Sequence, residues 1–348
     1  MKFGIFDYVD QRDEPAAKTF DDRMTFLQAA EEAGITGYHL TEHHATPLSL
    51  APSPSIFLAA AARETKRIRL GTLLYLLPLY QPLRLIEELC MLDHLSGGRL
   101  DIGVGTGVSP HEFTALGVPF ETARENFEEM FEVLHRGLTQ DRVDFHGKHV
   151  QLDNMRMVMK PLQRPHPPFW YGLRSDYGHG LAARYGMNAV TLGPTERISK
   201  SIARFRTAWR EEAAARKAIG TPVKEPLIGA MRAVVVADSD AEAVRIAAPA
   251  YEQWFENLCW LWKENGAFPP IALAPGFAEA RASGAIVAGA PETVRRSLAA
   301  QAESCGFNYL VMQLAFGTLG HEQEMRSLAL LGQEVIPALA RVEVAALS

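Results

Sequence analysis

Hydrophobic positions along the chain follow two alternating patterns. Short apolar runs recur, and the clearest of them, Ile68–Leu77, contains no acid and no amide. Such a run is typical of a strand buried on both faces, as in a parallel sheet. Between the runs, apolar residues recur at helical spacing, as at Phe20, Met24, Leu27 and Ala30. The pattern therefore predicts strands and amphipathic helices in turn.

Eight strand candidates alternate with helix candidates along the chain. Strict alternation implies a parallel sheet, and eight such units fit a closed (β/α)8 barrel, the TIM barrel of the α/β class. An open doubly wound sheet is the alternative. The predicted strands are Lys2–Tyr8, Tyr38–His44, Ile68–Leu77, Arg99–Gly105, Phe169–Leu173, Asn188–Leu192, Leu227–Ala237 and Tyr309–Leu314. The predicted helices include Phe20–Ala33, Ser55–Thr65, Leu83–Leu95, Thr122–Leu138, Gly178–Tyr185, Thr195–Ile219, Pro291–Ser304 and His321–Leu339. Another helix start is predicted at Ser109-Pro110-His111-Glu112, which combines a capping box with proline at the first helical position.

Two segments interrupt this rhythm, and we expect both to be insertions in a single domain spanning residues 1–348. A small hairpin turning at Gly147 is predicted near 143–168, before a proline-rich crossing. The second segment, 251–286, overlaps the end of a helix predicted from the Ser239 capping box as far as Lys263, and it is crowded with aromatic residues. It is either a mobile lid or an element that packs into the core or a dimer interface. Its aromatic residues are Trp254, Phe255, Trp260, Trp262 and Phe268.

Composition narrows the class of protein. The formal net charge of −6 argues against a nucleic-acid or anionic-membrane partner. Three widely spaced cysteines exclude a disulfide framework and fit a reducing cytosol, so we expect a cytoplasmic protein. The most apolar stretch, Leu70 to Leu83, contains two prolines and is too short for a membrane helix. The cysteines are Cys90, Cys259 and Cys305.

The predicted strand Tyr38–His44 ends in three ionisable residues, Glu42, His43 and His44. In a barrel the carboxyl ends of the strands form the site, so this stretch is the candidate for chemistry. Two exposed histidines on a surface loop are the alternative. The other strand ends are mostly apolar, among them Phe6, Tyr8 and Tyr75. The sequence thus predicts an apolar cup suited to a planar, largely apolar ligand.

Several other kinds of site fit this sequence poorly. Neighbouring strand residues point to opposite faces, so His43 and His44 would diverge, and no metal site is expected. The Gly-x-Ser-x-Gly elbow of a serine hydrolase is absent from the sequence. The run Gly103-Val104-Gly105-Thr106-Gly107 lacks the spacing of a dinucleotide fingerprint. Its glycines either allow a flat ring to approach the backbone or form a simple tight turn.

Arg174, Ser175 and Gly178 follow the fifth predicted strand, where a helix begins. Backbone N–H groups at a helix start, a hydroxyl and a guanidinium together favour an anion such as phosphate. Alternatively, Ser175 only caps the helix. The neighbouring Asp176 weakens the electrostatic case for an anion.

Several motifs spread over nearly the whole chain resemble the bacterial luciferase-like, flavin-dependent monooxygenases. The resemblance implies a (β/α)8 barrel, reduced FMN supplied by a separate flavin reductase, and a homodimer. The matching pieces are Thr41–His44, Ile68–Thr72 with Leu77-Pro78, Pro82 through Asp93 to Leu100, Phe145-x-Gly147, Pro161-x-Gln163-x-Pro165 before Pro167–Trp170, and Ala182–Gly186.

The resemblance also implies roles for individual residues. His43 matches a histidine near the reacting part of the flavin. Leu73 and Leu74 match a strand end where the family often has a cis peptide behind the flavin ring. Ser175 and Gly178 match the phosphate site.

Two positions depart from the luciferase pattern. Gly105-Thr106 stands where luciferases have Cys-Arg, which removes a cation and puts the light-emitting aldehyde reaction in doubt. Arg174 stands where they have Glu, and it would supply a replacement cation.

We therefore expect a monooxygenase in which reduced FMN and O2 give a C4a-(hydro)peroxide that oxidises a small, apolar organic substrate. His43 would manage a proton, with His44 and Glu42 orienting it. An F420-dependent oxidoreductase and a non-catalytic flavin-binding protein are the alternatives. The expected cofactor contacts are Thr72, Leu73, Leu74, Gly105, Thr106, Gly172, Arg174, Ser175 and Gly178, and the expected substrate contacts are Phe6, Tyr8 and Tyr75.

Overall fold

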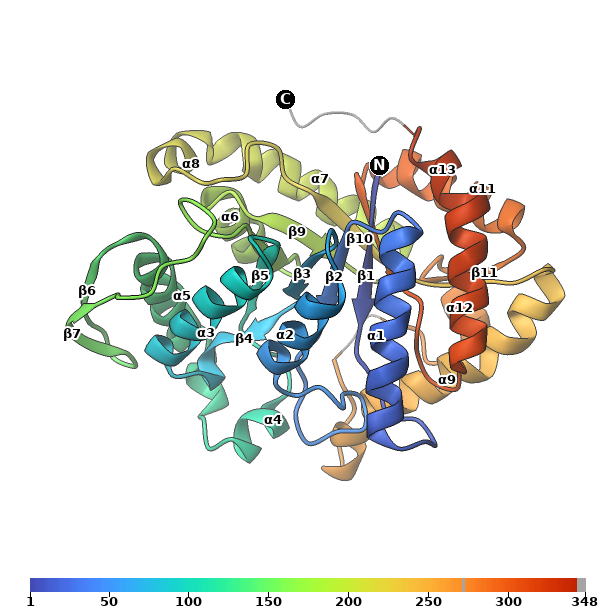
Figure 1. The fold of residues 1–348 in the computed structure, drawn as a ribbon, viewed down its shortest axis with the longest axis horizontal. Helices are drawn as coiled ribbons and strands as arrows, with labels where there is room; N and C mark the ends of the chain where they lie inside the picture. The colour runs from blue at the N-terminus through green and yellow to red at the C-terminus, as the bar shows by residue number, and fades with distance from the viewer. Residues whose placement is uncertain (271–272, 343–348) are drawn as a thin grey trace.

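A closed barrel of parallel strands forms the centre of the molecule (Figure 1). The computed structural model describes residues 1–270 and 273–342. Strand β1 pairs with β2 on one side and with the last strand, β12, on the other, where Ile5 lies opposite Met312. Since β10 bridges β9 and β12, the ring is closed. The barrel strands are β1 (Lys2–Asp7), β2 (Gly37–Leu40), β3 (Arg69–Thr72), β5 (Leu100–Gly105), β8 (Phe169–Gly172), β9 (Asn188–Thr191), β10 (Ile228–Val236) and β12 (Tyr309–Gln313).

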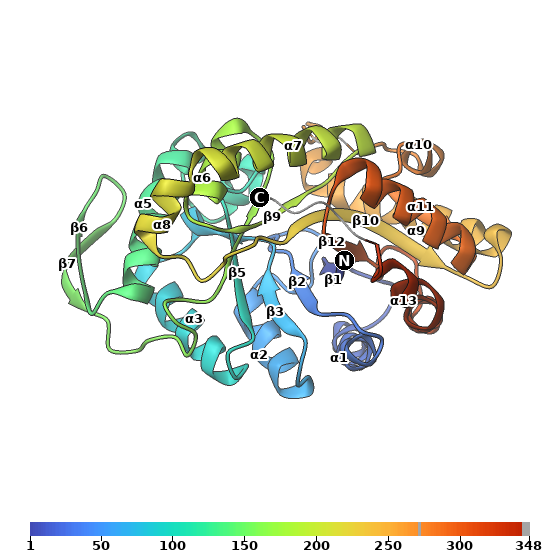
Figure 2. The same cartoon turned by 90° about the horizontal axis from the view of Figure 1, so that it is seen from above.

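Helices surround this barrel, as the view from above shows (Figure 2). Each of the larger ones turns an apolar face inward, as α5 does with Phe127, Phe131 and Leu134 at helical spacing. The predicted single-domain (β/α)8 barrel is confirmed, and an open sheet is excluded by the closed ring. The larger outer helices are α1 (Ala16–Glu32), α2 (Pro54–Glu64), α3 (Pro82–Leu95), α5 (Ala123–Thr139), α6 (Asp176–Arg184), α7 (Thr195–Glu211), α11 (Pro291–Cys305) and α12 (His321–Leu330).

The core has two layers, because successive strand residues point to opposite faces. On β12, Leu310 and Met312 face the outer helices, whereas Tyr309 and Val311 fill the barrel interior. Gln313 occupies the next interior position at the carboxyl end of the strand. The barrel is therefore packed below and open to loops only at its carboxyl rim.

A buried charge network fixes two outer helices to the first strand. Arg23 of α1 lies 2.8 Å from Asp7 of β1 and 3.2 Å from Glu324 of α12. Asp7 also accepts a hydrogen bond from the Tyr38 hydroxyl, at 2.8 Å. All four side chains are buried, so each charge depends on its partners.

Two predicted strands are shorter than the apolar pattern indicated. The strand predicted as Tyr38–His44 ends at Leu40, and the following residues form a loop. In this loop the backbone N–H of His44 donates to the Glu112 carboxylate. Glu42, in the same loop, accepts the backbone N–H of Leu76. The run Ile68–Leu77 divides into β3 and the short β4 (Tyr75–Leu76), with a cis Leu73–Leu74 peptide between them.

One strand was not predicted. β11 (Ile286–Gly289) follows the segment that lacks a clear period, and it pairs in parallel with the second half of β10. Because β10 is nine residues long, its first half closes the barrel against β12 while its second half extends past the rim. This extension is covered by α9 (Asp240–Glu264) and α10 (Phe277–Ala282).

Other boundaries also differ. The helix predicted as Thr195–Ile219 breaks at Glu212 into α7 and α8 (Ala213–Ile219). The helix predicted as His321–Leu339 contains a wide turn at Leu331–Val335 before α13 (Ile336–Leu339). The helix start at Ser109 is confirmed as α4 (Pro110–Ala115), but its capping box is wrong, because Glu112 points elsewhere.

The predicted hairpin is present as β6 (Arg142–His146) and β7 (Gln151–Arg156), which pair antiparallel. Its turn docks on α5, where the Glu129 carboxylate accepts hydrogen bonds from the N–H groups of Lys148, His149 and Val150. No helix in the described part of the chain is long and apolar enough to cross a membrane. Within the same residues, no cluster of His, Cys, Asp or Glu suits a metal ion.

Candidate functional site

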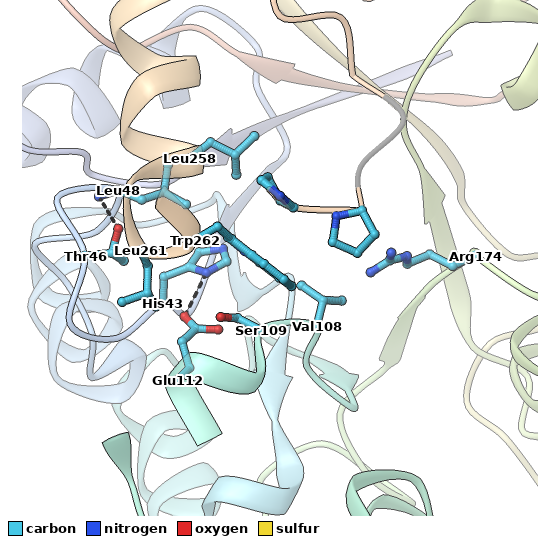
Figure 3. A pocket seen from close by; sticks show the side chains of 12 residues that line it. His43, Thr46, Leu48, Val108, Ser109, Glu112, Arg174, Leu258, Leu261 and Trp262 are labelled. Atoms are coloured by element: carbon cyan, nitrogen blue, oxygen red, sulfur yellow. Dashed lines mark hydrogen bonds and ion pairs between the residues drawn. The ribbon is translucent and has the colours of Figure 1, made fainter. Parts of the chain in front are cut away.

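A hollow of about 470 Å³ lies at the carboxyl rim of the barrel (Figure 3). Its walls come from the loops after β2, β5 and β8 and from α9 with the segment that follows it. The lining is mainly apolar, with a histidine, a carboxylate and an arginine among it. The lining residues are His43, Thr46, Leu48, Val108, Ser109, Glu112, Arg174, Leu258, Leu261, Trp262, Pro269 and Pro270.

His43 and Glu112 form the polar centre of this hollow. The Nδ1 atom of His43 lies 3.1 Å from Oε1 of Glu112, and the same oxygen accepts a hydrogen bond from the His44 N–H at 2.9 Å. Glu112 is buried, while the His43 side chain keeps 22% of its surface exposed. Tyr8 stacks on the imidazole with ring centres 5.7 Å apart. One carboxylate thus fixes both the ring of His43 and the loop that carries it.

Glu42 and His44 lie beneath the loop rather than in the hollow. The Nε2 atom of His44 is 2.8 Å from Oε1 of Glu42, and Oε2 of Glu42 accepts the Leu76 N–H at 3.0 Å. The Tyr80 hydroxyl also bonds to this carboxylate. We expected Glu42 and His44 to orient His43 directly. Instead they hold its backbone, and Glu112 contacts its ring.

The environment shifts the pKa values of these groups. Burial raises the pKa of Glu112, but the neighbouring His43 and His44 and the hydrogen bonds it accepts lower it by more, so the net shift is downward. Burial lowers the pKa of His44, but the hydrogen bond and charge of Glu42 outweigh it, so the net shift is upward. At neutral pH Glu112 is therefore a carboxylate that can accept the Nδ1–H of His43.

The wall expected behind a flavin ring is built from leucine and glycine. The cis peptide anticipated at Leu73–Leu74 is present. A side chain at Gly105 would meet Leu74, since an added Cβ would lie 2.6 Å from its Cδ1 atom. The absent side chain at Gly105 thus makes room for Leu74 rather than for a ring placed directly on the backbone. Gly172 lies on the other side of Leu74, with an added Cβ 3.5 Å from the same atom.

The two threonines expected at the cofactor are already engaged. The Thr72 hydroxyl donates to the Gly103 carbonyl at 2.9 Å and is fully buried. Thr106 is partly exposed and hydrogen-bonds to Tyr171. Thr72 therefore stabilises the barrel wall in this structure, and Thr106 alone retains access to the rim.

The expected anion site lies where β8 is followed by α6. Ser175 caps the helix by accepting the Gly178 N–H at 3.3 Å, and its hydroxyl remains able to donate. Burial and the nearby Arg197 both lower the pKa of Arg174, so two cations face each other there. Among the described residues neither arginine has an ion-pair partner. Asp176, which had seemed to oppose an anion, pairs instead with Arg204 at 3.1 Å.

The three residues expected at the substrate separate into two groups. Phe6 and Tyr8 face the barrel interior and pack edge to face, with ring centres 5.2 Å apart. Tyr75 lies instead in the outer core, where its hydroxyl is 3.0 Å from Ser55 Oγ and its ring packs edge-on against Tyr80. The structure therefore places Phe6 and Tyr8 in the barrel interior, where neither lines the hollow, and Tyr75 in the outer core.

The aromatic residues of 251–286 divide between core and hollow. Trp254 and Phe255 are buried on the inner face of α9, and the Tyr8 and Trp254 ring centres are 5.8 Å apart. Trp262 lines the hollow and packs edge-on against His111, with ring centres 5.1 Å apart. Trp260 and Phe268 are exposed, at 40% and 60% of their surface. Only part of this segment thus covers the site, and positions 271–272 lie outside the described residues.

Sequence reasoning did not identify Glu112, Ser109, Trp262 or Arg197 as site residues. Glu112 was assigned to a helix cap because it stands three residues after a serine and before an apolar run. Its contact with His43 joins residues 69 positions apart, which the fold brings together at the ends of β2 and β5. No local signal in the sequence separates these two roles.

Comparison with known proteins places the chain in a family. The family model described as luciferase-like monooxygenase matches residues 1–309. The chain is 36% identical to the uncharacterised protein y4wF of Sinorhizobium fredii over 92% of each chain. It is 27% identical to the oxygenase component of the flavin-dependent trigonelline monooxygenase of Acinetobacter baylyi, over 99% of this chain and 97% of that protein. The chain therefore belongs to the luciferase-like monooxygenase family.

Solved structures agree on the fold. The monooxygenase RslO1 of Streptomyces bottropensis superposes with a TM-score of 0.86 at 27% identity, covering 97% of this chain and 99% of that one. An F420-dependent tetrahydromethanopterin reductase of Methanopyrus kandleri shares the fold, with a TM-score of 0.69 at 19% identity over 97% and 99% of the two chains. The family thus indicates an oxidoreductase, and its fold is shared with a protein named as F420-dependent.

The His44–Glu42 pair predicts a pH dependence of stability. Because the folded-state pKa of His44 is raised above its ordinary value of 6.5, the pair contributes fully below that value. Its contribution is lost as the pH rises through the raised folded pKa. We expect the free energy of unfolding of wild type to exceed that of His44→Gln most at pH 5.5 and progressively less toward pH 9, in urea titrations.

The matched control is His146→Gln, on the exposed hairpin, which should leave the difference from wild type independent of pH apart from a small surface effect. If the wild-type and His44→Gln curves run parallel over this range, His44 does not gain a proton on folding, and its ion pair with Glu42 has no role in holding the loop.

Proposed function

We propose that this chain is an oxygenase that uses reduced FMN and O2 to oxidise a small, largely apolar organic substrate. One observation carries the proposal: a single hollow has the His43–Glu112 pair in its wall and Arg174 in the same lining. A proton-handling group and an anion-binding group thus flank one apolar space. FMN would match this space, because it combines a largely apolar ring system with a charged phosphate tail.

The residues present fit FMN in three respects. Arg174, Arg197 and the Ser175 hydroxyl at the start of α6 supply cations and donors for a phosphate dianion. Leu73 and Leu74 offer an apolar wall, with Gly105 and Gly172 beside it. The hollow is closed from above by apolar groups of α9 and the following segment. When bound, reduced FMN supplies the electrons that activate O2.

His43 is the group that would hold or move a proton at the reacting atoms. With Glu112 ionised and accepting from Nδ1–H, Nε2 is the ring nitrogen of His43 that remains available to exchange a proton. Tyr8 restricts the ring by stacking on one face. Glu112 is therefore a positioning residue that sets the tautomer of His43, while Glu42 and His44 keep the loop in place.

Water exclusion is the second task of the protein. Leu258, Leu261 and Trp262 present an apolar roof to the hollow, and the opposite wall contains Val108. A dry site strengthens every electrostatic contact inside it and limits side reactions with solvent. We propose that the roof segment 251–286 opens to admit ligands and closes during turnover.

An F420-dependent oxidoreductase is the second candidate, because the fold is shared with such an enzyme. It would transfer hydride without O2, so the cofactor that supports turnover distinguishes the two. A flavin-binding protein without activity is disfavoured by the His43–Glu112 pair, since a histidine held in one tautomer at an apolar hollow has no evident use in storage.

The relative named as an oxygenase component supports a separate flavin reductase as partner. We also propose a homodimer, and a cytoplasmic site consistent with the three free, buried cysteines.

Removing the imidazole should abolish most of the activity without unfolding the protein. We predict that His43→Ala retains the fold and FMN affinity but lowers the rate of substrate oxygenation by about 10²–10⁴, the usual effect of losing a general acid or base. The measurement is product formation per FMN consumed, with His146→Ala on the exposed hairpin as control. Full product formation in His43→Ala would remove this residue from the mechanism.

The proposed phosphate site gives a second prediction. Arg174→Ala should weaken FMN binding by about 10- to 150-fold, since one charge-assisted hydrogen bond contributes about 1.5–3 kcal/mol. Riboflavin lacks the phosphate and should bind equally well to both proteins. Affinities are measured by flavin fluorescence for wild type, Arg174→Ala and Ser175→Ala.

Arg204→Ala is the matched control, because Arg204 is a nearby exposed arginine whose charge already pairs with Asp176. Equal weakening of FMN and riboflavin in Arg174→Ala would mean that this residue shapes the loop. No weakening of either ligand would place the phosphate elsewhere.

Closure of the roof segment gives a third prediction. We expect limited proteolysis to cut between Gly266 and Gly284 in the free protein and to slow several-fold when FMN is added, because a closed roof protects its backbone. The exposed hairpin between β6 and β7 serves as an internal control whose cleavage should not respond to FMN. Identical cleavage of the roof in both states would identify 251–286 as a fixed packing element.

A further inference from the structure

A second, smaller hollow lies inside the barrel, under the middle of α9. Its wall is mostly apolar and contains small residues where larger ones would fill the space. The room left between these side chains is about that of one water molecule, so the hollow can take a single polar group at the end of a ligand but not a whole organic molecule. The lining residues are Gly193, Met231, Ala233, Tyr251, Trp254, Leu273, Ala285 and Gln313.

Gln313 is the polar residue that sets this hollow apart. The strand alternation of β12 directs it inward above Val311, and it lies opposite Ala233 of β10. Its side chain is 0% exposed, yet neither its amide oxygen nor its amide nitrogen has a hydrogen-bond partner among the described residues. Buried polar groups in native proteins nearly always have a partner, so this amide calls for one.

A second orphan donor lies in the same wall. The indole N–H of Trp254 is buried and has no partner in the described part of the chain. Tyr251, by contrast, uses its hydroxyl to donate to the Ala274 carbonyl at 2.7 Å. The hollow therefore offers N–H donors from two side chains and one carbonyl acceptor, and it contains no formal charge among its lining residues.

We propose that this inner hollow is a binding subsite for a neutral carbonyl or amide group, with Gln313 as its specificity-determining residue. A carbonyl oxygen would accept the N–H groups, and an adjacent N–H would donate to the Gln313 carbonyl. A charged group is disfavoured, because nothing in the lining compensates a buried charge. The inference deepens the proposed function and rests on it, since it assigns chemistry to the ligand of that site.

The position of the subsite links it to the larger hollow. Leu258, which lines the larger hollow, lies one helical turn after Trp254 on the same face of α9. Tyr8 packs between His43 and Trp254. A ligand whose carbonyl end occupies the inner hollow would thus lie under the same roof as the proton-handling pair. Two ligands carry this chemistry: a carbonyl-bearing organic substrate, and the pyrimidine-dione edge of the flavin itself.

Binding measurements without turnover test the subsite. The probe is 2-piperidone, a six-membered lactam that presents one carbonyl and one N–H side by side. We expect saturable binding to wild type by calorimetry and a loss of about tenfold or more in Gln313→Met, which keeps the side-chain length but removes both hydrogen-bonding atoms. The FMN affinity of both proteins is measured in parallel, and it shows whether the group in the subsite belongs to the organic substrate or to the flavin.

If Gln313→Met loses lactam binding but keeps its FMN affinity, the subsite belongs to the organic substrate. FMN affinity lost by a similar factor assigns the same chemistry to the flavin edge. If Gln313→Met changes neither affinity, the proposal is wrong. If the proposed function is wrong and the subsite is correct, wild type would still bind the lactam, but reduced FMN would support no O2-dependent turnover.

Stability provides an independent readout. Since the Gln313 amide has no partner in the described residues, Gln313→Met should leave the unfolding midpoint unchanged or raise it. The matched control is Gln301→Met, which should lower the midpoint because the Gln301 amide oxygen accepts a 2.6 Å hydrogen bond from buried Arg232. Equal destabilisation by both substitutions would show that Gln313 serves the fold, and the subsite would be rejected.

Discussion

Pairing of the first strand with the last closes the barrel, and the site is assembled at one rim of this closed barrel. β1 and β12 are separated by about 300 positions in the chain, yet Lys2 through Ile5 lie in register with Tyr309 through Met312. Closure forces the carboxyl ends of all the barrel strands to one rim. His43, Glu112 and Arg174 then line one hollow, although they are far apart in sequence, and Gln313 lines a second hollow nearby.

Two buried carboxylates convert that rim into a defined site. Glu42 binds His44 and the Leu76 N–H from below, and Glu112 binds His43 and the His44 N–H from the side. The loop is therefore held by charge-assisted hydrogen bonds where the strand ladder has ended. Preorganisation of this kind lets one imidazole face an apolar hollow in a fixed tautomer, which is the condition that proton handling requires.

The sequence allowed the barrel and the candidate chemistry at His43 to be predicted, because both leave local patterns, although His43 was assigned to the end of a strand and lies on a loop. Eight apolar runs that alternate with segments of helical spacing identify the strands. Ionisable residues at the end of one predicted strand identify the candidate chemistry. Glu112 and Gln313 could not be found in this way. The first looks like a helix cap and the second like the end of a buried strand, and only the closed barrel shows which space each one faces. β11 was missed because four small apolar residues before a proline carry too little periodicity.

The central claim is that the site works with reduced FMN and O2. The most direct measurement is an anaerobic titration of the protein with reduced FMN and, separately, with reduced F420, followed by rapid mixing with oxygenated buffer. The account predicts saturable binding of reduced FMN and O2-dependent formation of an oxygenated product from small apolar candidate substrates. Turnover supported by reduced F420 alone, with no product oxygen derived from O2, would contradict it.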